Sequence, residues 1–324
     1  MKIKALILFL FLALWGVLFF LNPTLLSGSQ TLLASLPSIK IPSSFYFAPT
    51  VVDAQEELKM YRGNRQRHGV SQEVLSLPLS KTVLATGVNE SPYLAAKSSP
   101  VIDETGLYVG SDRGEFLAYN LDGSLKWKFA PLPAMTGIHG TALLGPDSVV
   151  FGSYNGRLYS LDKKEGRVQW SIELASPGSI GSSPLQDREG FLYVSVELPS
   201  PDGFIVKLDK VDGHVVWLSK NVGDHPHSSP VLDEEHRQVV FGSNNDRVSS
   251  FDLDSGQLKW VMQVRGAVKS TPLVWGDKIY VTDRGGFLSA LDAGTGKVLW
   301  QQQLGSEGLH GSPVIVPELE RVYS

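Results

Sequence analysis

The sequence predicts an all-β protein, a β-propeller made of four-stranded antiparallel blades, because two short motifs recur along it with a common period. The first motif ends in tryptophan, and its clearest copy is Ala-Leu-Asp-Ala-Gly-Thr-Gly-Lys-Val-Leu-Trp, from Ala290 to Trp300. Earlier copies end at Trp127, Trp170, Trp217 and Trp260. From Trp127 to Trp300, successive tryptophans are 43, 47, 43 and 40 residues apart. Such a period is typical of arrays of repeated structural units.

The second motif is a small residue followed by proline and an apolar run. Its copies are Ser99-Pro100, Ser183-Pro184, Ser229-Pro230, Thr271-Pro272 and Ser312-Pro313, with Thr141-Ala142 as an imperfect copy. From this motif to the tryptophan, each repeat contains four runs of β-branched or aromatic residues bounded by turn formers, and Asp122-Gly123 is a two-residue hairpin signal. Four antiparallel strands in a unit of about forty residues describe one propeller blade.

The tryptophans are predicted to dock neighbouring blades. An indole on the outermost strand can lie flat across the next blade, bury roughly 150 to 250 Å² and donate its N–H to a backbone carbonyl. A ligand-stacking role is the weaker interpretation, because the residue recurs once per repeat at one structural position. The predicted docking residues are Trp127, Trp170, Trp217, Trp260 and Trp300.

The repeats give five complete blades and a partial sixth, which begins at Ser312-Pro313 and reaches its second strand at Arg321. We therefore expect a fragment of a six- to eight-bladed ring, lacking roughly 30 to 120 residues at this repeat length. The segment 81–87 lies ahead of the first Ser-Pro motif, where an outermost strand from the amino end would help to complete the last blade.

The amino terminus carries a 17-residue apolar run, Ala5 to Leu21, behind Lys2 and Lys4. This pattern indicates a signal peptide or a membrane-anchoring helix, and its positive flank directs the remainder out of the cytoplasm. We expect a periplasmic or other extracytoplasmic protein, either membrane-anchored or secreted. The predicted organisation is a signal or anchor helix at 1–21, a tether at 22–57 and the propeller at 58–324.

The pattern Ala-x-Asp-x-x-x-Gly-Lys-x-x-Trp at 290–300 resembles the tryptophan-docking motif of pyrroloquinoline-quinone-type propeller repeats. Looser copies precede Trp170, Trp217 and Trp260, and the resemblance covers about residues 58 to 324. It implies one of two kinds of protein. Quinoprotein dehydrogenases bind the quinone with calcium, whereas non-catalytic envelope propellers, including the lipoprotein of the outer-membrane β-barrel assembly machinery, bind partners.

The chain departs from both kinds of protein because it contains no cysteine. It therefore lacks the vicinal disulfide of methanol-dehydrogenase-like quinoproteins, any Cys-x-x-Cys-His haem site and any point for lipid attachment. Its blades are also compact, with one sizeable insertion, of about four residues, within 197–203, whereas the enzymes have long insertions that roof their active site. The resemblance is closer to the non-catalytic branch, for which no cofactor is expected.

A basic rim is predicted around the central channel. The residues three positions before each proline share the loop that enters an innermost strand: Lys97, His139, Gly181, His227, Lys269 and His310. Loops between second and third strands open on the same face and add Asp112, Arg113, Asn155, Asn245 and Arg284. Such a rim can bind carboxylates, sugars or the acid groups of a quinone, although solvent-facing turn residues are the plainer interpretation.

No metal site is predicted. His225 and His227 are two residues apart, but the sequence offers no compelling third ligand beside them. Asp209, Asp212, Asp252 and Asp254 suggest calcium loops, yet they fall in the hairpin turns of the tryptophan motif and are assigned to turn chemistry.

These observations favour a non-catalytic binding or scaffold module of the bacterial cell envelope. Its expected partner is a protein or a glycan, bound by the rim and the loop 197–203, with membrane contact through the amino-terminal helix. The formal net charge of −4 makes nucleic acid an unexpected partner. The alternative is a pyrroloquinoline-quinone-dependent dehydrogenase of alcohols or sugars, with quinone and calcium on the same rim; no catalytic residue can be named for it.

Overall fold

The structure is a computed structural model that describes the backbone of 38–40 and residues 58–69, 83, 88, 97–132, 137–199, 202–219, 222, 225–316 and 321–324. The predicted amino-terminal helix and most of the predicted tether lie outside these residues. Throughout the described part the regular elements are strands, and no helix there is long and apolar enough to span a membrane.

Five four-stranded antiparallel sheets follow one another along the chain, each with its strands in sequential order, and we number them blades 1 to 5. Their strands are, in order, β2 (Val101–Asp103), β3 (Gly106–Gly110), β4 (Phe116–Tyr119) and β5 (Leu125–Phe129); β6 (Leu143–Leu144), β7 (Ser148–Gly152), β8 (Arg157–Asp162) and β9 (Val168–Glu173); β10 (Leu185–Gln186), β11 (Phe191–Glu197), β12 (Gly203–Asp209) and β13 (Val215–Leu218); β14 (Val231–Asp233), β15 (Gln238–Ser243), β16 (Arg247–Asp252) and β17 (Leu258–Gln263); β18 (Leu273–Trp275), β19 (Lys278–Thr282), β20 (Phe287–Asp292) and β21 (Val298–Gln303).

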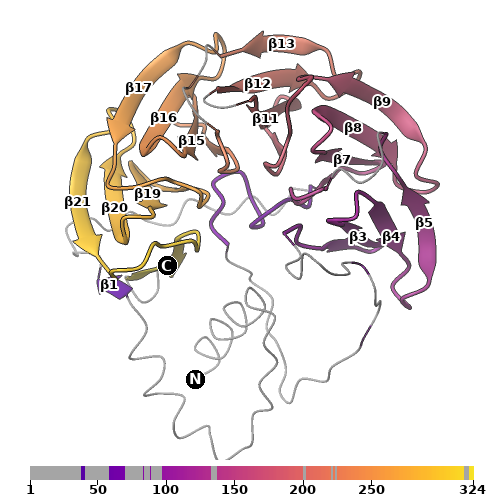
Figure 1. Ribbon diagram of the computed structural model, residues 1–324, viewed down its shortest axis with the longest axis horizontal. Coiled ribbons are helices and arrows are strands. Elements are labelled where there is room, and N and C mark those ends of the chain that lie inside the picture. Colours follow the sequence, from indigo (N-terminus) through magenta and orange to yellow (C-terminus); the bar gives the residue numbers. More distant parts are fainter. Residues whose placement is uncertain are drawn as a thin grey trace, which may run out of the picture.

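The sheets stand side by side around a common centre, with β5, β9, β13, β17 and β21 on the perimeter (Figure 1). Apolar side chains fill the space between neighbouring sheets. For example, the rings of Phe116 in blade 1 and Phe151 in blade 2 stack with centroids 4.1 Å apart. The prediction of an all-β propeller is confirmed.

In blades 2 to 5 the turn before the outer strand holds the tryptophan of the preceding blade. In blade 5, Asp292 Oδ1 accepts the Thr295 N–H at 2.9 Å, and Gly296 has a φ of 71°, which favours glycine. The indole of Trp260 covers Gly296, and its Nε1 donates to the carbonyl of Ala293 at 3.0 Å. Equivalent indole-to-carbonyl bonds of 2.9–3.0 Å join the other blades: Trp127 to Lys163, Trp170 to Lys210 and Trp217 to Leu253.

The second sequence motif forms a chain of hydrogen bonds around the channel. At four junctions the Ser or Thr of this motif accepts the N–H of its counterpart in the preceding blade at 2.9–3.1 Å: Thr141 from Ser99, Ser183 from Thr141, Ser229 from Ser183 and Ser312 from Thr271. A small hydroxyl residue recurs at this position because it links one innermost strand to the next.

A sixth sheet combines both ends of the chain. Strands β22 (Val314–Val316) and β23 (Arg321–Tyr323) pair antiparallel, and β1 (Ser38–Lys40) pairs antiparallel with β23. Strand β1 lies beside the carboxyl-terminal strands in Figure 1. The amino-terminal part of the chain thus supplies the third strand of the sixth blade from within the segment predicted as a tether. Of the segment 81–87 proposed for an outermost strand, only Val83 is described.

Residues 58–69, which we call the inner segment, run across the innermost strands near the middle of the ring (Figure 1). Backbone bonds tie this segment to blade 2 at Leu144, blade 4 at Leu232 and blade 5 at Val274. The guanidinium of Arg67 is fully buried and donates to the carbonyls of Tyr61, Ser183, Pro184 and Pro230. Burial lowers the pKa of Arg67 to about 9, so the group stays charged at neutral pH.

Candidate binding site at the channel rim

Neighbouring blades meet at the rim through one backbone hydrogen bond. The N–H of the apolar residue just before a rim position donates to a carbonyl at the end of the preceding blade's second strand, at 3.0–3.1 Å: Ile138 to Ser111, Ile180 to Ser153, Val268 to Ser243 and Leu309 to Asp283. The rim residues that follow are His139, Gly181, Lys269 and His310. Each of them is therefore placed beside the second-strand turn of the blade before it.

Buried serines show which turn residue faces each rim position. Ser98 Oγ accepts the Gly110 N–H, Ser182 Oγ that of Ser195, and Ser228 Oγ that of Gly242. These three strand residues are thus equivalent. The residue two positions after this strand residue lies in the turn that faces the rim. In blades 1 to 5 it is Asp112, Tyr154, Glu197, Asn244 and Arg284, respectively.

The third blade departs from this pattern in a way that brings Glu197 onto the rim. Strand β11 continues to Glu197, whose backbone exchanges two hydrogen bonds of 2.8 Å with Ser179. The next rim residue, His227, follows Pro226, which has no N–H to donate to blade 3. The usual backbone link is thus replaced by contacts between side chains.

His139 forms the first half of a cluster of titratable side chains. Its Nε2 lies 3.0 Å from Asp112 Oδ1, and its ring packs on Tyr154 with centroids 4.0 Å apart. The side chains of His139 and Asp112 are only 14% and 8% exposed. Burial, reinforced by the charge of Lys97, lowers the pKa of His139 to about 4, while the nearby carboxylates oppose this shift.

Glu197 forms the second half of the cluster. Its Oε1 lies 2.9 Å from His227 Nδ1, and its Oε2 lies 3.8 Å from His225 Nδ1. Gly181 lies between the two halves, because a Cβ built there would be 3.0 Å from Tyr154 Oη and 3.2 Å from Glu197 Oε1. Burial, together with the negative charges of Glu197 and Asp112, raises the pKa of Tyr154.

We call this set the rim cluster: Asp112, His139, Tyr154, Glu197, His225 and His227. It collects carboxylates, imidazoles and a phenol from four successive blades at one end of the channel. Buried titratable groups with perturbed pKa values that converge in one place are typical of binding and catalytic sites.

The other residues predicted for the rim lie outside this cluster. Lys97, Arg113, Lys269, Arg284 and His310 are exposed. Asn155 bonds within its turn to Tyr159 Oη and the Arg157 N–H. Asn245 bonds to Ser243 Oγ and the carbonyl of Val222. The two asparagines therefore hold turns, whereas Asp112, His139 and His227 meet in the cluster.

The sequence predicts the turns that contain Tyr154 and Asn244, with Asn155 and Asn245 as their site residues, and it does not single out Glu197 within the loop 197–203. A turn alone does not show which of its residues points to the channel. The small residues that bond to the second strand provide the missing reference. The residue whose N–H bonds to the buried serine is Ser195 in blade 3, and the residue two positions after it is Glu197.

Two of the acidic residues weighed as calcium ligands, Asp209 and Asp252, hold their own turns. Asp252 Oδ1 accepts the N–H groups of Asp254 and Ser255 at 3.2 and 2.9 Å. Asp209 Oδ1 likewise accepts the Val211 N–H at 2.7 Å.

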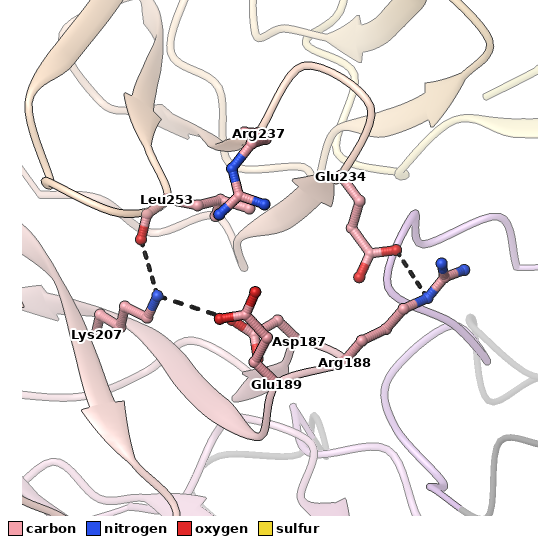
Figure 2. A pocket seen from close by; sticks show the side chains of 7 residues that line it. All are labelled: Asp187, Arg188, Glu189, Lys207, Glu234, Arg237 and Leu253. Carbon is pink, nitrogen blue, oxygen red and sulfur yellow. Dashed lines mark hydrogen bonds and ion pairs between the residues drawn. The ribbon is translucent and has the colours of Figure 1, made fainter.

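A second candidate is a cavity of about 230 Å³ between blades 3 and 4, shown in Figure 2. The ammonium of Lys207 donates to the carbonyl of Leu253 at 2.9 Å and lies 4.0 Å from Asp187, and Arg188 pairs with Glu234 at 3.2 Å (Figure 2). Because these charged side chains pair with one another, they are better explained as contacts that hold blades 3 and 4 together than as groups that bind a ligand.

The fold and the rim define a β-propeller of pyrroloquinoline-quinone-type repeats with a titratable cluster at its channel mouth. A family model described as outer membrane protein assembly factor BamB matches residues 72–196 and 201–323. The chain belongs to that family.

Individual relatives agree with this assignment. The outer membrane protein assembly factor BamB of Yersinia pestis is 28% identical over 221 residues, which cover 63% of this chain and 54% of that protein. The chain spans about half the length of the curated relatives it matches.

Solved structures show the fold. The crystal structure of BamB from Moraxella catarrhalis has a TM-score of 0.53 and 22% identity, with 69% of this chain and 68% of that chain covered. Quinohemoprotein alcohol dehydrogenase from Comamonas testosteroni has a TM-score of 0.55 and 16% identity, with 68% and 46% covered. At these identities the structural likeness supports the architecture and leaves the function to other observations.

Proposed function

We propose that this chain is a non-catalytic binding module of the bacterial cell envelope that contributes to outer-membrane protein assembly by holding a protein partner at its channel rim. The observation that carries this proposal is the rim cluster, in which Asp112, His139, Glu197 and His227 are paired across blade junctions. The curated relatives are outer membrane protein assembly factors, and this supports a protein of outer-membrane assembly as the partner.

The rim offers two zones to a partner. At the cluster, Asp112 and Glu197 are less than a tenth exposed and are held by neighbouring imidazoles. Around the rest of the rim, Lys97, Lys269 and Arg284 are exposed. A partner surface with acidic side chains around a protruding basic or hydrogen-bonding group would match this pattern of charges.

The dehydrogenase alternative is less well supported. The carboxylates that would have to hold the calcium ion at the cluster, those of Asp112 and Glu197, are instead each held by an imidazole, of His139 and His227. The chain also has no cysteine to form the vicinal disulfide expected in that branch. Titration of the full chain with pyrroloquinoline quinone and calcium is expected to give no binding and no dye reduction with alcohols or sugars; saturable binding with turnover would favour the alternative.

The partner proposal can be tested by site-specific photocrosslinking in the native envelope. A crosslinking amino acid at Arg284 or Lys269 is expected to capture an outer-membrane assembly protein, identified by mass spectrometry. The same amino acid at Asp254 or Lys164, exposed residues of turns at the other end of the blades, is the control. The combined change of His139, His227 and His310 to alanine is expected to abolish rim capture. The proposal would be contradicted if only the control positions captured a protein, or if the rim positions captured only a glycan. It would also be contradicted if the triple variant captured the partner as well as the parent chain does.

A further inference from the structure

Glu197, His225 and His227 form a compact set of potential metal ligands. One carboxylate oxygen and one nitrogen from each imidazole all lie within 4.8 Å of one another. The Glu197 side chain is 7% exposed, and each histidine side chain is 29% exposed. The set is thus anchored in the protein on the carboxylate side and accessible to solvent on the imidazole side.

The backbone holds these three residues firmly. Glu197 is fixed at the end of β11 by its two hydrogen bonds to Ser179. On the other blade, the His227 N–H donates to the carbonyl of His225 at 3.0 Å, which makes a tight turn around Pro226. Pro226 packs against Gly203 so closely that a Cβ at Gly203 would lie 2.3 Å from its Cδ. The ligand groups are therefore presented by rigid elements.

We propose that Glu197, His225 and His227 bind a divalent transition metal ion of the zinc class across the junction between blades 3 and 4. Two imidazoles and a carboxylate suit Zn²⁺, whereas Ca²⁺ and Mg²⁺ prefer sites made of oxygen ligands. The sequence alone gave no third ligand because Glu197 precedes the two histidines by a complete outer hairpin of its blade.

The distances fit an ion with small movements. Bonds of 2.0–2.2 Å place the ligand atoms of a tetrahedral zinc ion about 3.4 Å apart. Glu197 contacts His227 Nδ1 through Oε1 at 2.9 Å and His225 Nδ1 through Oε2 at 3.8 Å, so both imidazoles lie near this spacing from an oxygen of the carboxylate. Because the three ligand groups already lie within 4.8 Å of one another, movement of the side chains alone could bring them to this spacing, leaving further coordination positions for water or a partner's side chain.

The test uses the full chain, freed of metal with a chelator, and titration with Zn²⁺ alone at pH 7.5 by calorimetry. Co²⁺ serves as a second probe because its visible absorption reports the ligand geometry. We expect one ion per chain, with affinity lowered about tenfold or more by each of Glu197→Gln, His225→Gln and His227→Gln. At pH 5.5 the affinity should fall in the parent chain, because imidazoles must be deprotonated to bind the ion.

The matched control is His214→Gln, which alters the other group of potential ligands, Asp209, Asp212 and His214, on the surface of blade 3. That change is expected to leave the affinity unaltered. Near-ultraviolet circular dichroism shows whether each variant is folded, and the more exposed His225→Gln decides the matter if Glu197→Gln does not fold. Absence of saturable binding, or binding that depends on His214 and not on His225, would overturn the proposal. None of these readouts requires a partner protein, so a failed partner test leaves the metal test valid.

Discussion

The Ser183 N–H donates a hydrogen bond to Ser229 Oγ at 2.9 Å across the junction between blades 3 and 4. Both residues are buried, and both belong to the Ser-Pro motif that recurs along the sequence. The motif therefore acts between blades as well as within them, since its hydroxyl satisfies a backbone donor of the preceding repeat.

The first prediction concerns this hydroxyl. Ser229→Ala would leave the Ser183 N–H unsatisfied in a buried position and is expected to lower the free energy of unfolding by about 1–3 kcal/mol. Urea denaturation measures this change. Ser229→Thr is the matched control, because threonine occupies the equivalent positions 141 and 271 and keeps the hydroxyl. Equal stability of the alanine and threonine variants would refute the role assigned to the hydrogen bond.

The second prediction concerns the docking of Trp260. Gly296→Ala would place a Cβ 2.4 Å from Trp260 Cε3 on a residue with φ of 71°. We expect destabilisation of about 2 kcal/mol or more, from backbone strain and displacement of the indole. Quenching and wavelength of tryptophan fluorescence would report that displacement alongside thermal unfolding.

Gly294→Ala in the same turn is the control for this second prediction. Its Cβ would meet its nearest neighbour, His236 Cδ2, at 3.4 Å, an ordinary contact. This change should alter stability by about 0.5 kcal/mol or less. If the two glycine variants lost the same amount of stability, the loss in Gly296→Ala could not be attributed to close packing of the indole on Gly296.

The docking turn shows why the repeating part of this fold is predictable. Asp292 and Gly296 shape this turn within a few residues of chain, and the tryptophan that docks on it, Trp260, lies one repeat earlier, so the spacing of the motif carries the geometry. The same holds for the Ser-Pro motif, whose partner lies one repeat away at four blade junctions. Repetition thus provides several independent observations of one local structure.

The rim cluster and the inner segment were less predictable for physical reasons. Glu197 belongs to the extended strand β11 and is identified as a rim residue only through the hydrogen bond from the Ser195 N–H to Ser182 Oγ, a contact between two separate segments of the chain. Arg67 lies in a segment without a repeat and bonds to carbonyls 116 to 163 residues away in blades 3 and 4. Contacts at such separations follow from the assembled ring and have no signature in local sequence.

The third prediction concerns Arg67. Its guanidinium satisfies several carbonyls around the channel at once, which the single ammonium of lysine cannot do from one position. Arg67→Lys and Arg67→Met are each expected to lower the free energy of unfolding by about 2–5 kcal/mol. Chemical denaturation followed by circular dichroism tests this, with Arg167→Lys, at a largely exposed side chain, as the control. A loss below about 0.5 kcal/mol at Arg67, the level of a surface change, would contradict the prediction.

The fourth prediction concerns the pH dependence of stability through His68 in the inner segment. His68 Nε2 lies 2.9 Å from the carbonyl of Val274, and its Nδ1 lies 2.9 Å from Asn64 Nδ2. These partners are matched by a neutral imidazole that donates from Nε2 and accepts at Nδ1. Burial lowers the pKa of His68 to about 4, although the Val274 carbonyl opposes this shift.

Because the pKa is lower in the folded protein, the unfolded chain binds more protons between pH 6.5 and 4. The stabilising effect of neutral His68 is complete above this range and declines as the pH falls through it, by about 1.4 kcal/mol per pH unit where the protonation difference is one proton. His68→Gln should remove this dependence, so the stability of the variant should fall less steeply below pH 6. Denaturation curves at pH 7.5, 6, 5 and 4.5 measure both slopes. His139, whose pKa is also lowered, remains in both proteins and cancels in the comparison; identical slopes would show that His68 is not the group responsible.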